Sequence, residues 1–433
     1  MTARDAAMGI VKTLRDAGFS AYFAGGCVRD LLMGKACADY DVATSAKPDR
    51  IRALFARTIP VGEAFGVVLV LDQEHRFEVA TFRADGPYTD GRHPDTVTFT
   101  DVEGDVRRRD FTINGMMFDP VEERVIDLVG GRADLDAKVI RAIGEPRARF
   151  EEDRLRLVRA VRFSARLGFA IECATREAIV ALAPRVVSVS PERIAGEIEL
   201  MLADRSRGRA FRRLDELGLL AHLLPEVAAM KGVLQSADWH PEGDVFEHTM
   251  RCLDVAGDVR WELALAVLLH DVGKPPTASE RGFAGHEKVG ADMADAICRR
   301  LRLSNRERED VVWLVHNHMK FSVARQMKES TLRRLMSEPL FDDLAELHRI
   351  DALASAGDLS DYGFVMERRR AFLEEKPPVQ PLVTGHDLIA RGLAPGPAFA
   401  EILDELYDAQ IEGKFPDRDA ALAFLDDVLK RRG

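Results

Sequence analysis

Two aspartates, Asp39 and Asp41, stand two positions apart in the segment DYDVAT, residues 39–44. Residues i and i+2 of a β-strand point to the same side, so a strand here would present both carboxylates on one face and Tyr40 on the other. Carboxylate oxygens suit Mg²⁺, which keeps several waters and bridges to substrate phosphates. With 72 acidic residues in 433, such pairs also arise by chance. The neighbouring residues must therefore decide between a metal site and an acidic surface strand.

The segment GGCVRD, residues 25–30, lies just upstream of this pair. Gly25 and Gly26 allow backbone N–H groups to approach phosphate oxygens, and the start of a following helix adds a positive dipole end. Arg29 could reach the same phosphates. A Gly-Gly pair alone is usually only a turn, but its combination with Asp-x-Asp predicts a nucleotide site.

Two further segments supply polar side chains for such a site. Glu78 falls in FEVATFR, on a predicted neighbouring strand, where a third carboxylate would complete a metal triad; a solvated strand position is the alternative. The segment RRDFTIN, residues 108–114, adds Arg109, which could neutralise triphosphate charge. Asp110 and Asn114 could bind the sugar or orient the loop.

Together with EEDRLRLVRAVRF, residues 151–163, these segments resemble the class II tRNA nucleotidyltransferase and bacterial poly(A) polymerase family, over roughly residues 20–225. The resemblance implies a nucleotidyltransferase head in which Asp39 and Asp41 hold Mg²⁺. It also implies a helical neck that reads the incoming base. The expected partners are the 3′ end of tRNA, CTP and ATP.

In this family the pattern Glu-Asp-x-x-Arg reads the base, and here it falls on Glu152, Asp153 and Arg156. Cytosine and adenine each place an amino donor beside an unprotonated ring nitrogen. A carboxylate can accept from the amino group while a guanidinium donates to the nitrogen. Uracil and guanine reverse that polarity and would leave buried groups unpaired. Arg159 and Arg162 follow on the same helix, where they could contact triphosphate or RNA, or form a solvated arginine stripe.

The reaction implied is attack of an RNA 3′-hydroxyl on the α-phosphorus of CTP or ATP, with release of pyrophosphate. The same motifs serve poly(A) polymerases and enzymes that add only A or only CC, so these alternatives stay open. The segment RADGPYTDGRHPDTVTF, residues 83–99, resembles the flexible loop of members that add the full CCA, which favours addition of both nucleotides.

Histidines gather in the middle of the chain. Six of the 11 lie between residues 240 and 318, namely His240, His248, His270, His286, His316 and His318. The segment LALAVLLHDVGKP places His270 and Asp271 at the end of an apolar helix, where polar groups are costly unless they are paired or bound to metal.

With Asp351, this pattern resembles the HD phosphohydrolase superfamily. The resemblance implies a set of four metal ligands, with two more histidines available for a second ion or a substrate phosphate. The four are His248, His270, Asp271 and Asp351, and the two are His286 and His316. Imidazole and carboxylate ligands suit Mn, Ni, Co or Fe better than Mg.

The implied targets of this second site are 2′,3′-cyclic phosphates or nucleotide phosphates at RNA ends, and a domain that kept its core but lost its chemistry is the alternative. Two rival functions are an HD phosphohydrolase with a degenerate RNA-binding head and a non-catalytic RNA-binding protein. Intact Asp39, Asp41, Arg109, Asp153 and Arg156 argue against both. The further His-Asp pair in TGHDL, residues 384–388, has no partner histidines near it in sequence, so a structural role is expected.

The helices and strands expected around these residues indicate a fold of the α+β class. Ala7, Ile10, Val11 and Leu14 form one helical stripe, and the strands that follow suggest a small mixed sheet. A further helix is expected to begin at RRRDFTINGMMFD, residues 107–119. The expected domains are a nucleotidyltransferase head over 1–140, a mostly α-helical neck over 141–225, an HD domain over 226–375 and a helical tail over 376–433.

Composition limits the function classes. The net charge of −11 argues weakly against a broad nucleic-acid surface. Residues 141–213, however, carry 16 Arg, no Lys and 10 acidic residues, which indicates an RNA-binding neck or a face of Arg–Glu pairs. The chain shows neither a membrane span nor a signal-peptide pattern, and its five scattered cysteines lack C-x-x-C, so a cytoplasmic location is expected. The oligomeric state is not indicated.

Overall fold

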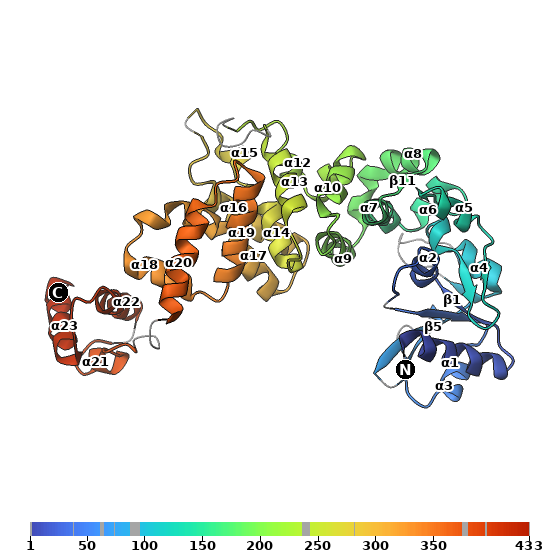
Figure 1. The fold of residues 1–433 in the computed structure, drawn as a ribbon, viewed down its shortest axis with the longest axis horizontal. Helices are drawn as coiled ribbons and strands as arrows, with labels where there is room; N and C mark the ends of the chain where they lie inside the picture. Colours follow the sequence, from blue (N-terminus) through green and yellow to red (C-terminus); the bar gives the residue numbers. More distant parts are fainter. Residues whose placement is uncertain are drawn as a thin grey trace. The chain divides into compact units, whose positions relative to one another are not determined.

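The computed structural model describes residues 2–37, 39–60, 65–72, 74–86, 96–235, 243–280, 282–374, 380–394 and 396–432 (Figure 1). The chain divides into two compact units. Unit 1 comprises Met1–Ala229 with Ile297–Leu303, and unit 2 comprises Met230–Ala296 with Ser304–Gly433.

Unit 1 begins with a mixed sheet in the order β3-β4-β5-β2-β1-β8-β9. Its strands are β1 Ala21–Ala24, β2 Asp41–Thr44, β3 Thr58–Pro60, β4 Val67–Asp72, β5 His75–Thr81, β8 Met117–Asp119 and β9 Arg124–Ile126. Strands β2 and β5 pair in parallel, whereas the other neighbours are antiparallel. Two small sheets join β6 Arg83–Asp85 to β7 Val97–Phe99 and β10 Val139–Ile140 to β11 Ala170–Ile171. The predicted α+β class with a mixed-sheet head is confirmed.

Helix α1 (Ala3–Asp16) packs on this sheet through the predicted stripe. Ala7, Ile10, Val11 and Leu14 are all buried. The helix begins at a capping box in which Thr2 and Asp5 satisfy each other's backbone N–H groups. The remaining helices of the head are α2 Gly26–Leu32, α3 Pro48–Leu54, α4 Val102–Arg107 and α5 Gly131–Asp136. Figure 1 draws α2 across the sheet from α1.

The helix predicted to begin at residue 107 is wrong, because α4 already ends at Arg107 and no α-helix follows in the described residues before β8. Thr112–Asn114 is a 3₁₀ turn, η2, and β8 follows directly. The Asp110 carboxylate accepts the backbone N–H of Phe111 and the side-chain amide of Asn114, which holds the chain in a turn. Phe111, Ile113, Met116 and Met117 are all fully buried, so this segment has no polar face to offer a surface helix.

The described residues of unit 1 after β10 are helical apart from β11, which follows α7 in the chain. The helical elements here are α6 Pro146–Glu152, α7 Leu155–Leu167, α8 Cys173–Leu182, η3 Ala183–Ser188, α9 Pro191–Leu202, α10 Arg207–Glu216, α11 Leu220–Leu223 and α12 Pro225–Ala228. Helix α7 ends at Gly168, whose φ of 71° is a left-handed conformation that favours glycine. Helices α9 and α10 pack against α7, which carries Arg156 of the predicted base-reading pattern, whereas Glu152 ends α6 and Asp153 lies between the two helices.

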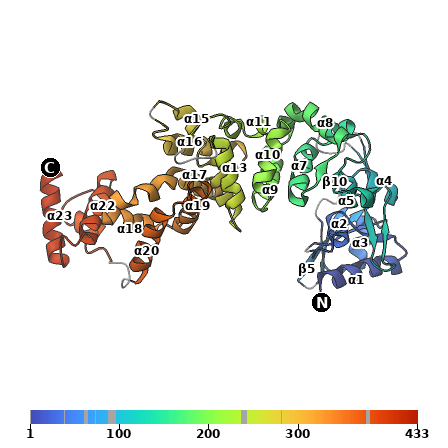
Figure 2. The ribbon, with the colours of Figure 1, turned by 45° about the horizontal axis from the view of Figure 1, so that its top comes forward.

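Unit 2 contains only helices among its named elements (Figure 2). They are α13 Val245–Val255, α14 Trp261–Leu269, α15 Lys274–Thr277, α16 His286–Arg300, α17 Asn305–Asn317, η4 His318–Gln326, α18 Glu329–Ser337, α19 Phe341–Ala354, α20 Ser360–Glu374, α21 Gly385–Ile389, α22 Pro397–Ile411 and α23 Arg418–Arg432. Helix α14 is buried on every side from Leu263 to Leu269. No helix in the described part of the chain is long and apolar enough to cross a bilayer.

The three last helices share a small core of their own, formed by Val383, Leu388, Ile402, Leu406, Ala409, Phe415, Ala421, Leu425 and Val428. The His-Asp pair of TGHDL lies here. Asp387 caps α21 together with Thr384 and binds Arg418 at 2.6 Å between Oδ1 and Nη2. These contacts give Asp387 a structural task.

Candidate functional site

Unit 1 holds a polar cavity at the turn between β1 and α2. Its walls include eleven of the head and neck residues predicted from sequence: Gly25, Gly26, Arg29, Asp39, Asp41, Arg109, Asp110, Asn114, Asp153, Arg156 and Arg159. Glu78 and Arg162 do not line it. The loop predicted at residues 83–99 lies outside the described residues over 87–95.

Gly25 makes the close approach at the floor of this cavity possible. Its φ of +75° lies in the region that favours glycine. A Cβ at this position would lie 3.3 Å from Nη1 of Arg109 and 3.6 Å from Oδ2 of Asp41. The turn thus brings backbone, a cation and a carboxylate together at the start of α2.

Asp39 and Asp41 lie on the side opposite Tyr40, as the two-residue alternation of a strand predicts, although only Asp41 belongs to β2. Tyr40 is buried against Phe23, with ring centroids 5.1 Å apart, and both aspartates are exposed. Val42 pairs with Val79 in the parallel β2–β5 ladder, so the same register brings Asp41 beside Glu78. Although the residue is exposed overall, desolvation of its carboxylate, then repulsion from Glu78, raises the pKa of Asp41 to about 6. A divalent cation would relieve that repulsion, so this donor set fits a metal.

Arg109 is held in the cavity by Asp105, which sequence reasoning missed. Oδ2 of Asp105 accepts from Nε and Nη2 of Arg109 at 3.2 and 2.8 Å, and Oδ1 accepts from Arg108 at 2.9 and 2.6 Å. Burial alone would raise the pKa of Asp105, but the two guanidinium groups hold it below its ordinary value. A buried carboxylate two residues before the RRRD segment is thus the anchor for both arginines.

Asn114 connects α2 to α7 through Arg29, Asp110 and Arg159. Its Oδ1 accepts from Nη1 of Arg29 at 2.8 Å, and its Nδ2 donates to Oδ1 of Asp110 at 3.1 Å. Asp110 in turn accepts from Nε and Nη2 of Arg159 at 2.9 and 2.7 Å. Burial would raise the pKa of Asp110, but Arg159 and the hydrogen bonds hold it below its ordinary value.

Asp153 and Arg156 both line the cavity, and each has a fixed orientation. Asp153 accepts from both terminal nitrogens of Arg193, at 3.0 and 2.8 Å. Arg156 donates from Nη1 to Glu152 at 3.0 Å and from Nη2 to the backbone carbonyl of Arg108 at 2.9 Å. Arg193 was missed because it lies 40 residues away on α9.

Arg162 faces the interior of the neck. Its Nε donates to Glu197 at 2.6 Å, and its guanidinium lies 4.4 Å from the centre of the Phe163 ring. Arg29 and Arg159 also lie over Phe163, at 5.4 and 5.3 Å. Phe163 itself lines the cavity, so it joins the arginines of the loop and of α7.

Unit 2 contains two groups of side chains with metal-ligand spacing among the residues that the structure describes. The first comprises His248, Cys252, His270 and Asp351. Nε2 of His248 lies 3.0 Å from Oδ1 of Asp351, and Nε2 of His270 lies 4.0 Å from the same oxygen. His270 donates from Nδ1 to the carbonyl of Val267, and its buried Nε2 has no hydrogen-bond partner among the described residues. Such a nitrogen fits a metal ligand.

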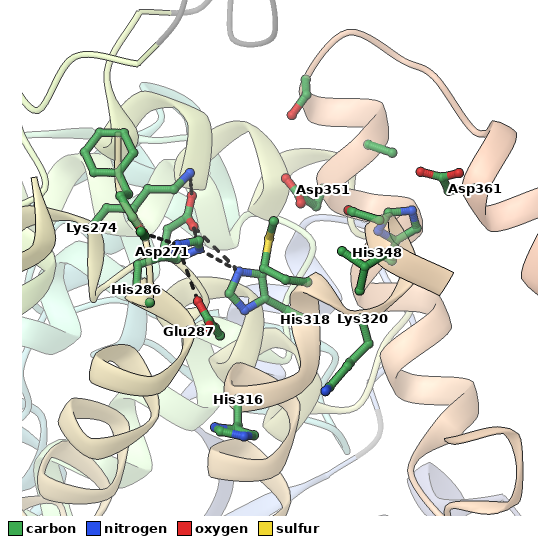
Figure 3. Close-up of a pocket in the computed structure, with 18 of the residues that line it drawn as sticks. Asp271, Lys274, His286, Glu287, His316, His318, Lys320, His348, Asp351 and Asp361 are labelled. Atoms are coloured by element: carbon green, nitrogen blue, oxygen red, sulfur yellow. Dashed lines mark hydrogen bonds and ion pairs between the residues drawn. The ribbon is translucent and has the colours of Figure 1, made fainter. Parts of the chain in front are cut away.

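The second group comprises Asp271, His286 and His318 (Figure 3). Both histidines donate from Nδ1 to backbone carbonyls, of Phe283 and Val315 respectively. Their Nε2 atoms therefore face each other as lone pairs, 3.1 Å apart. Two nitrogens bound to one ion at about 2.0–2.1 Å are separated by about 2.9–3.4 Å. Burial, then repulsion from His270, lowers the pKa of His318 to about 4, which keeps the ring neutral as a ligand must be.

Asp271 lies between the two groups. Its Oδ2 is 3.2 Å from Nε2 of His270, and its Oδ1 is 3.5 Å from Nε2 of His286. Lys274 donates to Oδ2 at 2.6 Å. Burial would raise the pKa of Asp271, but the charges of His270 and Lys274 hold it well below its ordinary value. The carboxylate is thus ionised and placed to serve both groups.

His316 lies outside both groups, exposed on the wall of the neighbouring cavity, and His318 takes the position beside His286. The sequence held the signal, because the buried stripe of α17 runs through Val311, Leu314 and Val315, and helical spacing from these residues continues onto residue 318. His240 lies outside the described residues.

Family models match three parts of the chain. They are described as the poly A polymerase head domain, over residues 21–141, the probable RNA and SrmB-binding site of polymerase A, over 168–231, and the HD domain, over 245–356.

Relatives and solved structures point the same way. A CCA-adding enzyme of Geobacillus thermodenitrificans is 35% identical over 366 residues, which is 83% of this chain and 86% of the relative. A CCA-adding enzyme of Lacticaseibacillus paracasei is 32% identical over 95% of this chain and 93% of its own. The crystal structure of the Bacillus stearothermophilus CCA-adding enzyme in complex with CTP has a TM-score of 0.73 at 29% identity, covering 100% of this chain and 99% of that one.

Proposed function

The chain belongs to the family of CCA-adding enzymes, and from that premise we propose how its residues perform the reaction. The activity is nucleotidyl transfer: C and A are added to the 3′ end of tRNA from CTP and ATP, without a nucleic-acid template, and pyrophosphate leaves. Poly(A) synthesis and A-only or CC-only addition are not favoured, because relatives along nearly the whole chain are CCA-adding enzymes. We assign the head to residues 1–140, the neck to 141–225, the HD domain to 226–375 and the tail to 376–433. The scattered cysteines support a cytoplasmic location.

The observation that carries the mechanism is the convergence of the aspartate pair, the glycine turn and Arg109 in one cavity. Asp39, Asp41 and Glu78 would hold Mg²⁺, which when bound activates the attacking hydroxyl and stabilises the leaving oxygen. The turn at Gly25 leaves room for triphosphate oxygens beside Arg109. Asp105 fixes that guanidinium in place, so little reorganisation is needed as charge develops.

Base choice falls to Asp153 and Arg156. The Asp153 carboxylate accepts the amino group of cytosine or adenine, and Arg156 donates to the adjacent ring nitrogen. Arg193 and Glu152 fix the orientation of these two side chains. A uracil would present an acceptor to Asp153 and a donor to Arg156, and both contacts would be lost.

The test is a set of incubations with tRNAs that end before, within and at the CCA terminus, supplied with CTP, ATP or both and with Mg²⁺. Ordered addition of C, C and A followed by a stop is the expected result. Open-ended A tails would instead make the enzyme a poly(A) polymerase, and a stop after CC or addition of A alone would assign a partial activity.

The HD domain supports a second activity. Six imidazole and carboxylate groups and Cys252 converge beside Lys274, and this donor set fits divalent transition metals such as Mn, Ni, Co or Fe better than Mg. A bound ion of this kind supplies an activated water for phosphoester hydrolysis. We propose that this site hydrolyses phosphates at RNA ends or on nucleotides, with Lys274 available to a phosphate oxygen. Two reactions of the metal-loaded chain test it: opening of 2′,3′-cyclic RNA ends to a phosphomonoester, and release of inorganic phosphate from 3′-phosphorylated RNA and from nucleotides. Neither reaction with any of the four metals would refute it.

A further inference from the structure

A sulfur atom lies among the ligands of the first metal group. Cys252 follows His248 by one helical turn on α13 and is fully buried, as is His248. Its Sγ belongs to the same compact set as the donor atoms of His248, His270 and Asp351, all within 4.8 Å of one another. The HD pattern accounts for the two histidines and the aspartates, but it does not call for this thiol.

The distances agree with coordination to one ion. Sγ of Cys252 lies 3.5 Å from Nε2 of His248. Metal–sulfur and metal–nitrogen bonds of about 2.3 and 2.0–2.1 Å at a tetrahedral angle separate the two ligand atoms by about 3.5 Å. The 3.0 Å between His248 Nε2 and Asp351 Oδ1 is likewise the separation of two ligands at about 90°.

A second observation points into the same space. Nε2 of His270 is buried without a hydrogen-bond partner among the described residues, while its Nδ1 is committed to a carbonyl. Its ring centroid lies 5.5 Å from that of His248. This nitrogen lies 3.2 Å from Oδ2 of Asp271 without a hydrogen bond to it. With the thiol, the second imidazole and the Asp351 carboxylate it makes a site with four donors of three chemical kinds.

We propose that the Cys252 thiolate is a further ligand of the metal ion held by His248, His270 and Asp351. The inference rests on the proposed HD metal centre. As the sulfur–metal bond forms, the thiol proton leaves to solvent. A soft thiolate favours Zn²⁺, Co²⁺ and Fe²⁺ over Mg²⁺ and Mn²⁺. The competing account is an ordinary S–H···N hydrogen bond between residues one helical turn apart.

Cobalt substitution of the full chain separates these accounts, because thiolate ligation gives Co²⁺ a strong sulfur-to-metal charge-transfer absorption and oxygen or nitrogen ligands do not. The chain is stripped with a chelator, reloaded with Co²⁺, and its cobalt content and near-ultraviolet absorption are measured. We expect the band in the wild type and its loss in Cys252→Ser and Cys252→Ala, with cobalt still bound. Affinity for Zn²⁺ relative to Mn²⁺ should fall at least about tenfold.

Three controls make the result specific. Cys37→Ser removes a thiol beside the head cavity, and Cys298→Ser removes another buried thiol outside both metal groups; both should keep the band. His270→Ala should lower the cobalt content. Two results would overturn the role of Cys252 while leaving the HD metal centre in place. One is a charge-transfer band that persists in both Cys252 variants. The other is a wild type whose cobalt content depends on His270 but which shows no charge-transfer band. Equal cobalt content in the wild type and in His270→Ala would show that the proposed HD metal centre does not exist, and the inference about Cys252 would fail with it. If circular dichroism shows that both Cys252 variants are misfolded, the test depends on the wild type and His270→Ala. A charge-transfer band in the wild type that is lost in His270→Ala supports the thiolate ligand, and a wild type without the band contradicts it.

Discussion

At the scale of single residues, Asp153, the carboxylate that we propose reads the base, depends on a partner from another helix. Arg193 holds both oxygens of Asp153 in a forked pair. A lysine offers one point charge in place of the planar fork, so it leaves one oxygen of the carboxylate without its partner. The orientation that rejects uracil thereby loosens.

We therefore predict that Arg193→Lys lowers the preference for CTP over UTP by about tenfold, or about 1.4 kcal/mol in transition-state discrimination. Asp153→Ala should lower it further. The measurement is kcat/KM for each nucleotide on a tRNA that lacks CCA. Arg185→Lys, at an exposed pair with Glu151, is the matched control and should change nothing. An unaltered CTP/UTP ratio in Arg193→Lys would exclude Arg193 from base selection.

The two neighbouring histidines of α17 and η4 allow a similarly matched comparison. His318 faces Asp271 and His286, whereas His316 is exposed. We predict that His318→Ala lowers the metal bound per chain, measured by elemental analysis after dialysis, while His316→Ala leaves it unchanged. Equal losses in both variants, or a loss in His316→Ala only, would contradict the assignment of ligands.

Residue type and spacing were sufficient where one short segment supplies the chemistry. Asp39 and Asp41 are one example. The His270–Asp271 pair is another, since polar groups at the end of an apolar helix are costly and need a compensating partner. Arg193 and Cys252 escaped prediction for different reasons. The first comes from a distant helix, and the second is a residue type whose usual place is simply the core.

At the scale of elements, the turn between β1 and α2 sets how closely the cations and carboxylates approach. Gly25 and Gly18 both have positive φ, of +75° and +86°, but only Gly25 has side chains within 4 Å of its missing Cβ. Gly25 combines this φ with a ψ of −135°, outside the left-handed helical region in which an alanine costs about 1–2 kcal/mol, so the backbone strain of Gly25→Ala is at least that large.

We predict that Gly25→Ala weakens nucleotide binding, seen as a KM for CTP raised at least about fivefold, because the methyl group displaces Arg109 or Asp41. Gly18→Ala, which also replaces a glycine of positive φ, should lose stability and keep the wild-type KM. If Gly25→Ala also kept it, the turn would not form part of the nucleotide site.

Helix α7 is joined to the head by the ion pair of Asp110, which is buried, and Arg159, which is partly exposed. Removal of one member of such a pair leaves the other without its charge partner, so Asp110→Asn should lower the free energy of unfolding by about 3 kcal/mol at pH 7. The pKa of Asp110 is depressed in the folded chain. Its stabilisation is therefore complete above the unfolded pKa of about 3.9 and is lost as pH falls through the lower folded value.

The difference between wild type and Asp110→Asn should accordingly shrink from pH 7 towards pH 3, as measured by urea unfolding followed by far-ultraviolet circular dichroism. Asp136→Asn, an exposed position on α5, should have little effect at either pH. A difference that grows on acidification would show that Asp110 is not the ionised partner of Arg159.

The elements themselves were predictable where one face is apolar. The stripe of α1 and the alternation around Tyr40 follow directly from helix and strand periodicity. The 3₁₀ turn at Thr112–Asn114 was not predictable, because its neighbours are buried on all sides and its shape depends on hydrogen bonds made by Asp110.

At the scale of the whole molecule, the head and HD sites belong to different compact units. Each unit has its own core. We predict that Asp41→Ala abolishes nucleotide addition and leaves phosphate release by the HD site unchanged, and that Asp271→Ala does the reverse. Both activities are measured on the same full-length preparations. Loss of both activities in either folded variant would end the two-site account.

Charged side chains are unevenly distributed along the chain. The chain carries −11 overall, but its neck concentrates arginine. Many of these arginines serve the architecture: Arg156, Arg159, Arg162 and Arg193 each pair with a carboxylate. The expectation of a face of Arg–Glu pairs thus describes part of the neck.

The complete absence of lysine between residues 141 and 213 has a practical result. Acetylation neutralises lysine and not arginine, so no acetyltransferase can switch off the positive charge of this stretch. Amine-reactive cross-linkers will, for the same reason, return no peptide joined through it, and a footprint of bound tRNA there must be sought with arginine-directed dicarbonyl reagents.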